Sequence, residues 1–442
     1  MVLAAVIAIR SQLVSTASAH THRRSDDPVA DASVLLAGTT RGAVARGAVL
    51  PPPAPGQHWL ASWGAGPQEA AGNQVAVRGF RDQTLREIVF ASTGGTRVRV
   101  HFTNLYGSRP LVIGNASVAP ADRGAGLASG SIRPLTFGGH HWASVPPGAE
   151  VVSDPVMLRV APGSELAISI YLPEATGAAT EHTQARQLSF VAAGNAALSP
   201  AANRFRGRTT SWYFIDGVDL LSSRRDIGAV VTLGDSITDG VGSPAGANAR
   251  WPNDLARRLD ALRGPTLSVI DEGIGGNRVL NDSACCGVDA VARFENDVAQ
   301  RTGVRDVILL EGINDIGYSL KRGALTAPHT DVSALQIIDG YEQIIALAHA
   351  DGLRIFGATL TPFQGARYWS PAGEAKREAV NDWILTSGAF DGVIDFAHVL
   401  ADPSDPERLN PAYDSGDHLH PNAAGYCAMA NAVSLAALLR SH

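Results

Sequence analysis

The sequence predicts an all-β domain followed by an α/β domain that is built on a five-stranded parallel sheet. In the first part, residues 57–222, polar and apolar residues alternate with a period of two, as in Glu165–Leu172. Such alternation is typical of half-buried strands. In the second part, residues 223–442, strand-like apolar runs alternate with helical patterns. That alternation favours a parallel sheet with helices on both faces.

The all-β part is expected to be a sandwich of the jelly-roll type. Its short apolar runs are separated by clusters of Gly, Pro, Asn and Asp, a spacing that is typical of such folds. No long amphipathic pattern predicts a helix in this part. The expected strands are Leu85–Ala91, Arg97–Phe102, Leu111–Val118, Val151–Leu158, Glu165–Leu172, Leu188–Ala192 and Ser211–Ile215.

The α/β part opens with a run rich in β-branched residues, which predicts a fully buried strand. Pro421 lies just ahead of the last helical pattern, at a position where proline is tolerated. The expected strands are Ile227–Leu233, Leu267–Asp271, Val304–Glu311, Leu353–Leu360 and Val393–Phe396, and the expected helices are Asn253–Leu262, Val332–Ala350, Glu374–Thr386 and Asn422–Leu439.

The first 19 residues are similar to a secretory signal peptide. Val2–Ile9 is apolar, and Ala17-Ser18-Ala19 matches a small-x-small cleavage site. The start is atypical, because no Lys or Arg precedes the apolar run and Arg10 follows it closely. Residues 20–56 are rich in Ala, Pro, Arg and Gly and are expected to form a disordered leader or linker. We therefore expect a secreted protein. The alternative is that the first 19 residues are an ordinary Ala-rich tail and not a signal peptide.

Composition argues against several classes of partner. The formal net charge is −6, and no dense block of Lys or Arg favours nucleic acid or an anionic membrane surface. No later run of about 20 apolar residues predicts a membrane span. The three cysteines, Cys285, Cys286 and Cys427, leave open a vicinal bridge, a bridge to Cys427 or three free thiols. Their spacing does not suggest a zinc site, and the sequence gives no indication of the oligomeric state.

Polar residues stand where the predicted parallel strands end. Ser236 follows the first strand, the glycine-rich run 273–278 follows the second, and Asn314 follows the third. Asp417 and His420 precede the last helix. Because ligands of open α/β sheets bind at the carboxyl edge, these groups are expected to converge on one crevice. A serine there is a candidate nucleophile if a base removes its proton, and Asp417 with His420 suits an acid–base pair.

These blocks, in this order, resemble the SGNH (GDSL) hydrolase family. Ser236 matches the nucleophile of the Gly-Asp-Ser block, Gly276 the oxyanion glycine and Asn314 the asparagine of the Gly-x-Asn-Asp block. Asp417 and His420 match the Asp-x-x-His-Pro block. The resemblance covers the α/β part and implies a flavodoxin-like three-layer domain. The β-rich first part is similar to the N-terminal domain of a secreted esterase and lipase branch of that family.

The resemblance implies a serine carboxylic ester hydrolase that needs neither a metal nor an organic cofactor. His420 is expected to take the Ser236 proton as the hydroxyl attacks an ester carbonyl, and Asp417 is expected to orient the imidazole. The oxyanion hole would consist of the N–H groups of Ser236 and Gly276 and the side-chain amide of Asn314. The serine is not in a Gly-x-Ser-x-Gly elbow, which argues against the α/β-hydrolase fold.

The residues of these motifs also have structural interpretations. Ser236 could simply cap a helix. His418 competes with His420 as the base, and Gly275 competes with Gly276 as the oxyanion glycine. Asp315 is expected to be structural. The segment Arg367-Tyr368-Trp369 could pack in the core or line a pocket.

The sequence leaves the substrate open, from small-molecule esters to polysaccharide esters of any acyl length. A carbohydrate deacetylase that acts on acetylated polysaccharide is one alternative, because the appended β-domain could bind glycan. A glycan-binding or adhesive protein with a vestigial site is an alternative of another class. A transacylase would use the same residues, since an acyl-enzyme can pass its acyl group to an alcohol.

Overall fold

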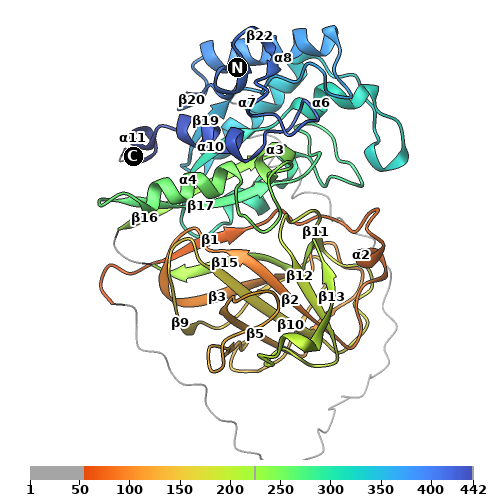
Figure 1. Cartoon of the computed structure of the whole chain (residues 1–442), viewed down its shortest axis with the longest axis vertical. Coiled ribbons are helices and arrows are strands. Elements are labelled where there is room, and N and C mark those ends of the chain that lie inside the picture. The colour runs from red at the N-terminus through yellow and green to blue at the C-terminus, as the bar shows by residue number, and fades with distance from the viewer. Residues whose placement is uncertain (1–53, 223–224, 441–442) are drawn as a thin grey trace, which may run out of the picture. The chain divides into compact units, whose positions relative to one another are not determined.

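The computed structural model describes residues 54–222 and 225–440 (Figure 1). The predicted signal peptide at residues 1–19 and nearly all of the predicted linker at 20–56 lie outside the described residues, so both stay predictions. The predicted domain boundary at 222/223 also stays a prediction. None of the helices within the described ranges has the length and apolar character that a membrane crossing requires.

Two antiparallel sheets build the first part of the chain, coloured from orange to yellow-green in Figure 1. One apolar cluster contains residues of both sheets, with Val100 and Val218 from one and Val89 and Ile168 from the other. A core shared by two sheets is the arrangement of a sandwich. The prediction of an antiparallel, all-β first part is therefore confirmed.

The strands of this part fall into two larger sheets and two short pairs. The five-stranded sheet consists of β1 (Trp59–Gly64), β15 (Ile215–Leu221), β3 (Gly95–Thr103), β8 (Glu150–Val152) and β9 (Val156–Val160). The six-stranded sheet consists of β13 (Phe205–Thr209), β12 (Ser189–Ala193), β2 (Gln83–Phe90), β10 (Glu165–Leu172), β5 (Asn115–Pro120) and β6 (Arg133–Pro134). The short pairs are β4 (Leu111–Ile113) with β7 (Ala143–Val145) and β11 (Glu181–His182) with β14 (Trp212–Tyr213).

Three predicted strands of this part are each divided in two. Leu111–Val118 becomes β4 and β5, because β4 pairs with β7 whereas β5 pairs with β10. Val151–Leu158 is interrupted at Pro155, which has no N–H to give to a ladder. Ser211–Ile215 is interrupted at Phe214, whose φ of 60° is incompatible with an extended strand.

The second part is built on a five-stranded parallel sheet, as the sequence predicts. The sheet order is β17-β16-β18-β19-β20, in which the second strand along the chain lies at one edge beside the first. This is the flavodoxin-like order, and ligands bind where it changes direction, next to the first strand. The strands are β16 (Asp226–Gly234), β17 (Thr266–Gly273), β18 (Val304–Leu310), β19 (Arg354–Ala358) and β20 (Gly392–Ile394).

Helices cover both faces of this sheet. The chain moves from β16 to β17 in one direction and from β18 to β20 in the other, so right-handed crossovers put α4 on one face and α7 and α8 on the other. Contacts of α4 with β17 and of α7 with β19 agree with that arrangement (Figure 1). The α-helices of the second part are α3 (Ser236–Asp239), α4 (Trp251–Asp260), α5 (Ala290–Phe294), α6 (Ile313–Gly317), α7 (Ala334–Ala350), α8 (Pro371–Thr386), α9 (Phe396–Leu400), α10 (Ala423–Ala432) and α11 (Leu435–Leu438), whereas α2 (Gln74–Arg78) belongs to the first part.

The predicted last helix, Asn422–Leu439, is wrong in extent. It is divided into α10 and α11, because Val433 is extended and the side chain of Ser434 caps a new helix by accepting from the N–H of Ala437. Asn422 is the cap of α10 rather than part of it. The site residues lie ahead of this division, so their placement does not depend on it.

The two parts share buried contacts. Ala61 and Phe90 of the antiparallel part belong to the apolar core that surrounds the parallel sheet. The Val269 N–H in β17 donates to the Ser92 hydroxyl at 3.1 Å. Gly64 at the end of β1 lies so close to β17 that a Cβ atom there would meet the Glu272 carboxylate at 2.2 Å. The antiparallel part therefore packs directly against the edge strand of the parallel sheet.

Candidate active site

The register of the parallel strands brings three loops to one edge. Gly234 at the end of β16 pairs with Gly273 of β17 and with Leu310 of β18. The three strands therefore end at the same level, and the residues that follow them in sequence emerge side by side. The loops that carry Ser236, Gly276 and Asn314 therefore lie at one edge of the sheet.

Ser236 is the first residue of the short helix α3, at the end of β16. Asp235, and not Ser236, is the cap, because its carboxylate accepts from the Ile237 N–H at 2.8 Å. The interpretation of Ser236 as a capping residue is therefore wrong. The helix ends after one turn at Gly240, whose φ is 88°. Ser236 is 7% exposed, so this serine is largely buried in the loop.

The structure brings Ser236, His420 and Asp417 into one hydrogen-bonded chain. Ser236 Oγ lies 2.8 Å from His420 Nε2, and His420 Nδ1 lies 2.6 Å from Asp417 Oδ2. The N–H groups of Leu419 and His420 donate to the other oxygen of Asp417, at 3.0 and 2.9 Å. An imidazole whose Nδ1 is held by a carboxylate presents Nε2 as an acceptor to the serine.

These contacts also decide the charge of Asp417. Partial burial raises the pKa of this carboxyl group, but the hydrogen bonds from the ring and N–H of His420 and from the Leu419 N–H outweigh burial. They hold the pKa of Asp417 well below its usual range. Asp417 is therefore an anion throughout the neutral range and stabilises a positive charge on His420.

His418 makes a separate pair and does not reach the serine. Its Nδ1 lies 2.7 Å from Asp414 Oδ2, and its side chain is 57% exposed. The backbone of His418 has a φ of 62°, in the left-handed region that few non-glycine residues adopt. The geometry thus favours His420 over His418 as the partner of Ser236.

Gly276 lies on the loop after β17 with a φ of 81°. A Cβ atom there would meet the Tyr318 hydroxyl at 2.4 Å and Cys286 Sγ at 2.6 Å, so the position requires glycine. Within the described residues, the Gly276 N–H has no hydrogen-bond partner. Gly275, the alternative oxyanion glycine, has more room, because a Cβ atom there would lie 3.5 Å from Asp239 Oδ2. The unpartnered N–H makes Gly276 a suitable donor to an oxyanion.

Asn314 lies in α6, directly after β18. Its amide nitrogen donates to the Asn277 carbonyl at 3.0 Å and approaches Asp235 Oδ2 at 3.4 Å. Its amide oxygen accepts from the Tyr368 hydroxyl at 3.2 Å, which fixes the orientation of the amide group. The long contact with Asp235 is weak, so this N–H can turn to another acceptor at little cost.

Asp315 is structural, as expected. Its carboxylate accepts from the N–H groups of Val279 and Leu280 at 2.8 and 3.2 Å and holds the loop that carries Gly276. Burial raises the pKa of Asp315 to about 7, although these two N–H groups and Arg278 lower it. Asp315 therefore connects the segment after β18 with the loop after β17.

Cys285 and Cys286 form a vicinal disulfide below Gly276, which was one of the open alternatives, whereas Cys427 is free and exposed. Cys286 Sγ lies 3.5 Å from the Tyr318 hydroxyl. The Cys286 carbonyl accepts from the side chain of Asn277 at 2.8 Å. The disulfide therefore contributes to the floor under the glycine loop.

Arg293 is a positioning residue that the sequence analysis missed. Its guanidinium donates to the Gly234 and Glu272 carbonyls at 2.9 and 2.7 Å and to Asn277 Oδ1 at 2.9 Å. It also pairs with Asp297 at 2.9 Å. Arg293 thus ties the end of β16, the end of β17 and the glycine loop together. A lone arginine among the apolar residues of α5 was the available signal.

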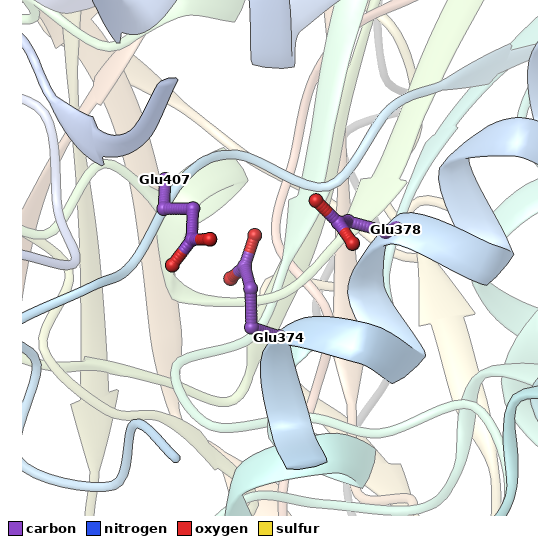
Figure 2. A group of neighbouring side chains, drawn as sticks. All are labelled: Glu374, Glu378 and Glu407. Carbon is purple, nitrogen blue, oxygen red and sulfur yellow. The ribbon is translucent and has the colours of Figure 1, made fainter. Parts of the chain in front are cut away.

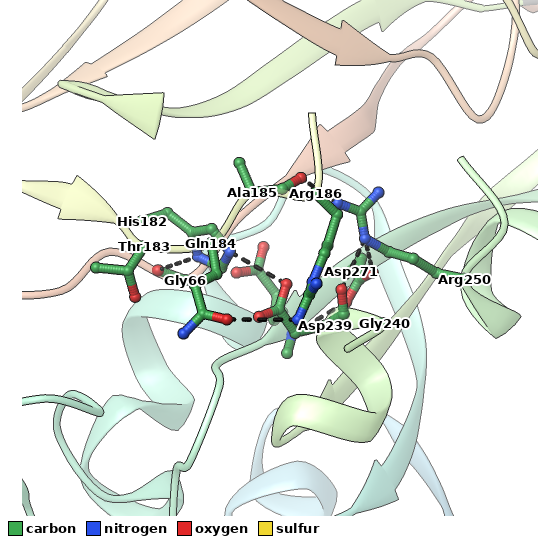
Figure 3. Close-up of polar contacts among 12 residues, drawn as sticks. Gly66, His182, Thr183, Gln184, Ala185, Arg186, Asp239, Gly240, Arg250 and Asp271 are labelled. Carbon is green, nitrogen blue, oxygen red and sulfur yellow. Dashed lines mark hydrogen bonds and ion pairs between the residues drawn. The ribbon is translucent and has the colours of Figure 1, made fainter. Parts of the chain in front are cut away.

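His182 is a second missed residue, and it comes from the antiparallel part (Figure 3). Its Nδ1 lies 2.9 Å from the Gly66 carbonyl, and its Nε2 lies 3.4 Å from Asp239 Oδ1. Arg250 Nε donates to the Asp239 carbonyl at 2.8 Å from the other side. The last residue of α3 is therefore held by the antiparallel part and by the start of α4.

A group of three carboxylates lies away from these residues. The carboxylates of Glu374, Glu378 and Glu407 lie within 4.8 Å of one another (Figure 2). Arg377 donates to both oxygens of Glu374, and Gln364 donates to Glu407 Oε2 at 3.0 Å. Protein groups therefore already bind two of the carboxylates, and we assign no metal to them.

Comparison with known proteins identifies the second part. Residues 232–428 match the model of the GDSL-like Lipase/Acylhydrolase family. The C-terminal region is a GDSL-like lipase/acylhydrolase domain. The match spans all four blocks that the sequence analysis singled out, and it makes the chain a hydrolase. A search of the curated proteins finds no match.

Solved structures of the same type resemble the GDSL domain at low identity. A GDSL-like lipase from Bacteroides thetaiotaomicron is 18% identical, over 48% of this chain and 88% of that chain, with a TM-score of 0.36. An aryl esterase from M. smegmatis is 17% identical, over 46% of this chain and 95% of that chain, with a TM-score of 0.35. An acetyl xylan esterase, AlAXEase, is 19% identical, over 46% of this chain and 96% of that chain, with a TM-score of 0.35. The family assignment rests on the family model alone.

The contact of His182 with the GDSL domain predicts a pH dependence of stability. Burial lowers the pKa of His182, and the charge of Arg250 lowers it further. The hydrogen bond and charge of Asp239, together with the hydrogen bond to the Gly66 carbonyl, outweigh these effects, so the pKa of His182 is raised overall. A histidine whose folded pKa is raised contributes stability that is complete below its unfolded pKa of about 6.5 and is lost as pH rises through the folded pKa. We expect the free energy of unfolding to fall less steeply above about pH 6.5 in His182→Gln than in the parent.

Urea unfolding at a series of pH values measures that slope. His398→Gln is the matched control, because His398 is exposed in α9, far along the chain from α3, and should keep the slope of the parent. An identical slope in His182→Gln and the parent would contradict a charged contact between His182 and Asp239.

Proposed function

We propose that the chain is a serine carboxylic ester hydrolase in which Ser236 is the nucleophile, His420 the general base and Asp417 the residue that orients His420. The chain of two short hydrogen bonds, 2.8 Å from Ser236 to His420 and 2.6 Å from His420 to Asp417, carries this proposal. Such an arrangement lets a neutral imidazole take the hydroxyl proton while the carboxylate stabilises the resulting charge.

Acylation would begin as Ser236 Oγ bonds to the ester carbonyl carbon and its proton passes to His420 Nε2. The carbonyl oxygen then carries a negative charge, and we assign the N–H groups of Ser236 and Gly276 and the Asn314 amide as its donors. The proton on His420 moves to the leaving alcohol oxygen as the C–O bond breaks. The products of this half-reaction are an alcohol and an acyl group esterified to Ser236.

Deacylation would follow the same path with water in place of the alcohol. His420 takes a proton from the water, whose oxygen bonds to the acyl carbon, and then returns the proton to Ser236 Oγ. A carboxylic acid leaves, and Ser236 and His420 regain their first states. An alcohol could replace water in this step, which would give transacylation by the same residues.

A turnover series on p-nitrophenyl esters from acetyl to palmitoyl tests the proposal, with Ser236→Ala as the inactive variant. We expect hydrolysis by the parent and no turnover above background by Ser236→Ala, because alanine has no hydroxyl to acylate. Circular dichroism and thermal melting check that the variant is folded. Full activity in a folded Ser236→Ala variant would contradict the assignment of the nucleophile.

The same series separates the substrate classes within the proposal. Activity confined to the acetyl ester would favour a carbohydrate deacetylase, for which acetate release from acetylated xylan is the direct assay. Activity that persists to esters with long acyl chains would favour a lipase-type hydrolase. A folded parent that hydrolyses none of these esters would favour the binding or adhesive alternative. Secretion remains part of the proposal, motivated by the signal-like leader.

The assigned oxyanion hole gives a second prediction. Asn314→Ala should lower kcat by about 10²–10³ while KM changes little, because an oxyanion donor acts mainly in the transition state. Asn431→Ala, an exposed asparagine of α10, is the matched control and should keep the kcat of the parent. An unchanged kcat in Asn314→Ala would remove this side chain from the oxyanion hole.

A further inference from the structure

A pocket of about 520 Å³ lies beside the residues of the proposed triad. Asp417 and Leu419, from the turn that carries His420, form part of its wall. Tyr368, whose hydroxyl donates to the Asn314 amide oxygen, forms another part. Two residues of the pocket wall, Asp417 and Tyr368, therefore contact the base and an assigned oxyanion donor, and the pocket volume suits a small organic group.

Three cationic side chains, Lys321, Arg322 and Arg367, supply much of the remaining wall. Within the described residues none of the three forms an ion pair with Asp or Glu. The acid in the pocket, Asp417, is already paired with His420. Asp417 is an anion, so the wall carries three cationic side chains against one carboxylate, and its net charge is positive.

Lys321 is held in place by aromatic rings instead of by an acid. Its Nζ lies 4.1 Å from the ring centre of Tyr318 and 5.3 Å from that of Tyr368. Burial lowers the pKa of Lys321, and the charges of Arg367 and Arg278 lower it further. A cation with only cationic neighbours gains more from an incoming anion than a paired cation does.

The other lysine of the chain makes the contrast clear. The sequence contains two lysines among 36 basic residues, Lys321 and Lys376. Lys376 pairs with Asp331 at 2.5 Å on the surface. Of the two lysines, only Lys321 lines this pocket together with two arginines and without an acidic partner among the described residues.

We propose that this pocket binds an anionic group, a carboxylate or a phosphate, in the acyl or alcohol part of the ester substrate. Guanidinium groups bind both kinds of anion through paired N–H donors, and an ammonium group adds a point charge. The inference rests on the proposed function, because it concerns the substrate of the same site. It narrows the substrate from esters in general to esters that carry a negative charge near the scissile bond.

Matched pairs of esters test the inference. p-Nitrophenyl hydrogen adipate against p-nitrophenyl hexanoate places a charge in the acyl part, and 4-acetoxybenzoate against 4-acetoxybenzamide places it in the alcohol part. 4-Acetoxyphenyl phosphate separates phosphate from carboxylate. We expect kcat/KM for at least one anionic ester to exceed that for its neutral partner by roughly tenfold, and the ratio to fall in about 0.5 M NaCl.

The cationic residues should control that ratio. Lys321→Gln and the double variant Arg322→Gln/Arg367→Gln should each lower the ratio of anionic to neutral kcat/KM by about threefold to tenfold. Both arginines are exposed, so the double variant keeps the test valid if Lys321→Gln does not fold. Lys376→Gln is the matched control and should leave the ratio as in the parent.

The outcomes separate the inference from the proposed function. Hydrolysis of neutral esters with no preference for any anionic partner would overturn the inference and leave the esterase proposal intact. A preference that survives removal of all three cations would also overturn it. Absence of hydrolysis of every ester would overturn both.

Discussion

A buried guanidinium holds together the edge of the sheet on which the proposed chemistry depends. Arg293 is 4% exposed and donates to the carbonyl groups at the ends of β16 and β17 and to the side chain of Asn277 in the glycine loop. Asp297 supplies the opposite charge that such burial requires. The serine and the unpartnered glycine N–H are therefore positioned by strand ends that share one cation, and Asn314 joins them by donating to the Asn277 carbonyl.

The antiparallel part also contributes to this arrangement. His182 contacts the last residue of α3, and Gln68 donates to the Cys285 carbonyl at 3.2 Å beside the disulfide. One contact reaches the helix that carries Ser236, and the other reaches the loop under Gly276. The antiparallel part is thus a support for the nucleophile and for the glycine loop, which is a structural reason for its presence beside a GDSL domain.

Much of the site could be predicted because its residues are tied to strand ends and to one short turn. Strand periodicity placed Ser236 and Asn314 after neighbouring strands, and parallel strands end at a common edge. Asp417 and His420 are three residues apart, so their contact is local. The sequence pattern did not predict the end of α10. Apolar residues stand on both sides of Ser434, so the pattern there is that of a continuous helix and Ser434 is not recognisable as a cap.

The supporting contacts could not be predicted, because they join residues that are distant in sequence. His182 and Asp239 are 57 residues apart, and Arg293 reaches Gly234 across 59 residues. Cys285 and Cys286 are adjacent, but their pairing depends on the conformation of the surrounding loop. The pocket lined by Lys321, Arg322 and Arg367 likewise forms only in the folded chain, because its residues come from the segment after α6, the loop after β19 and the turn that carries His420.

The most direct test of the account is covalent labelling of the folded chain with a fluorophosphonate, followed by peptide mapping. The account predicts one label per chain, on the peptide that contains Ser236, because His420 is placed to take the proton of that hydroxyl. Labelling at another residue, or no labelling of a folded chain, would contradict Ser236 as an activated nucleophile.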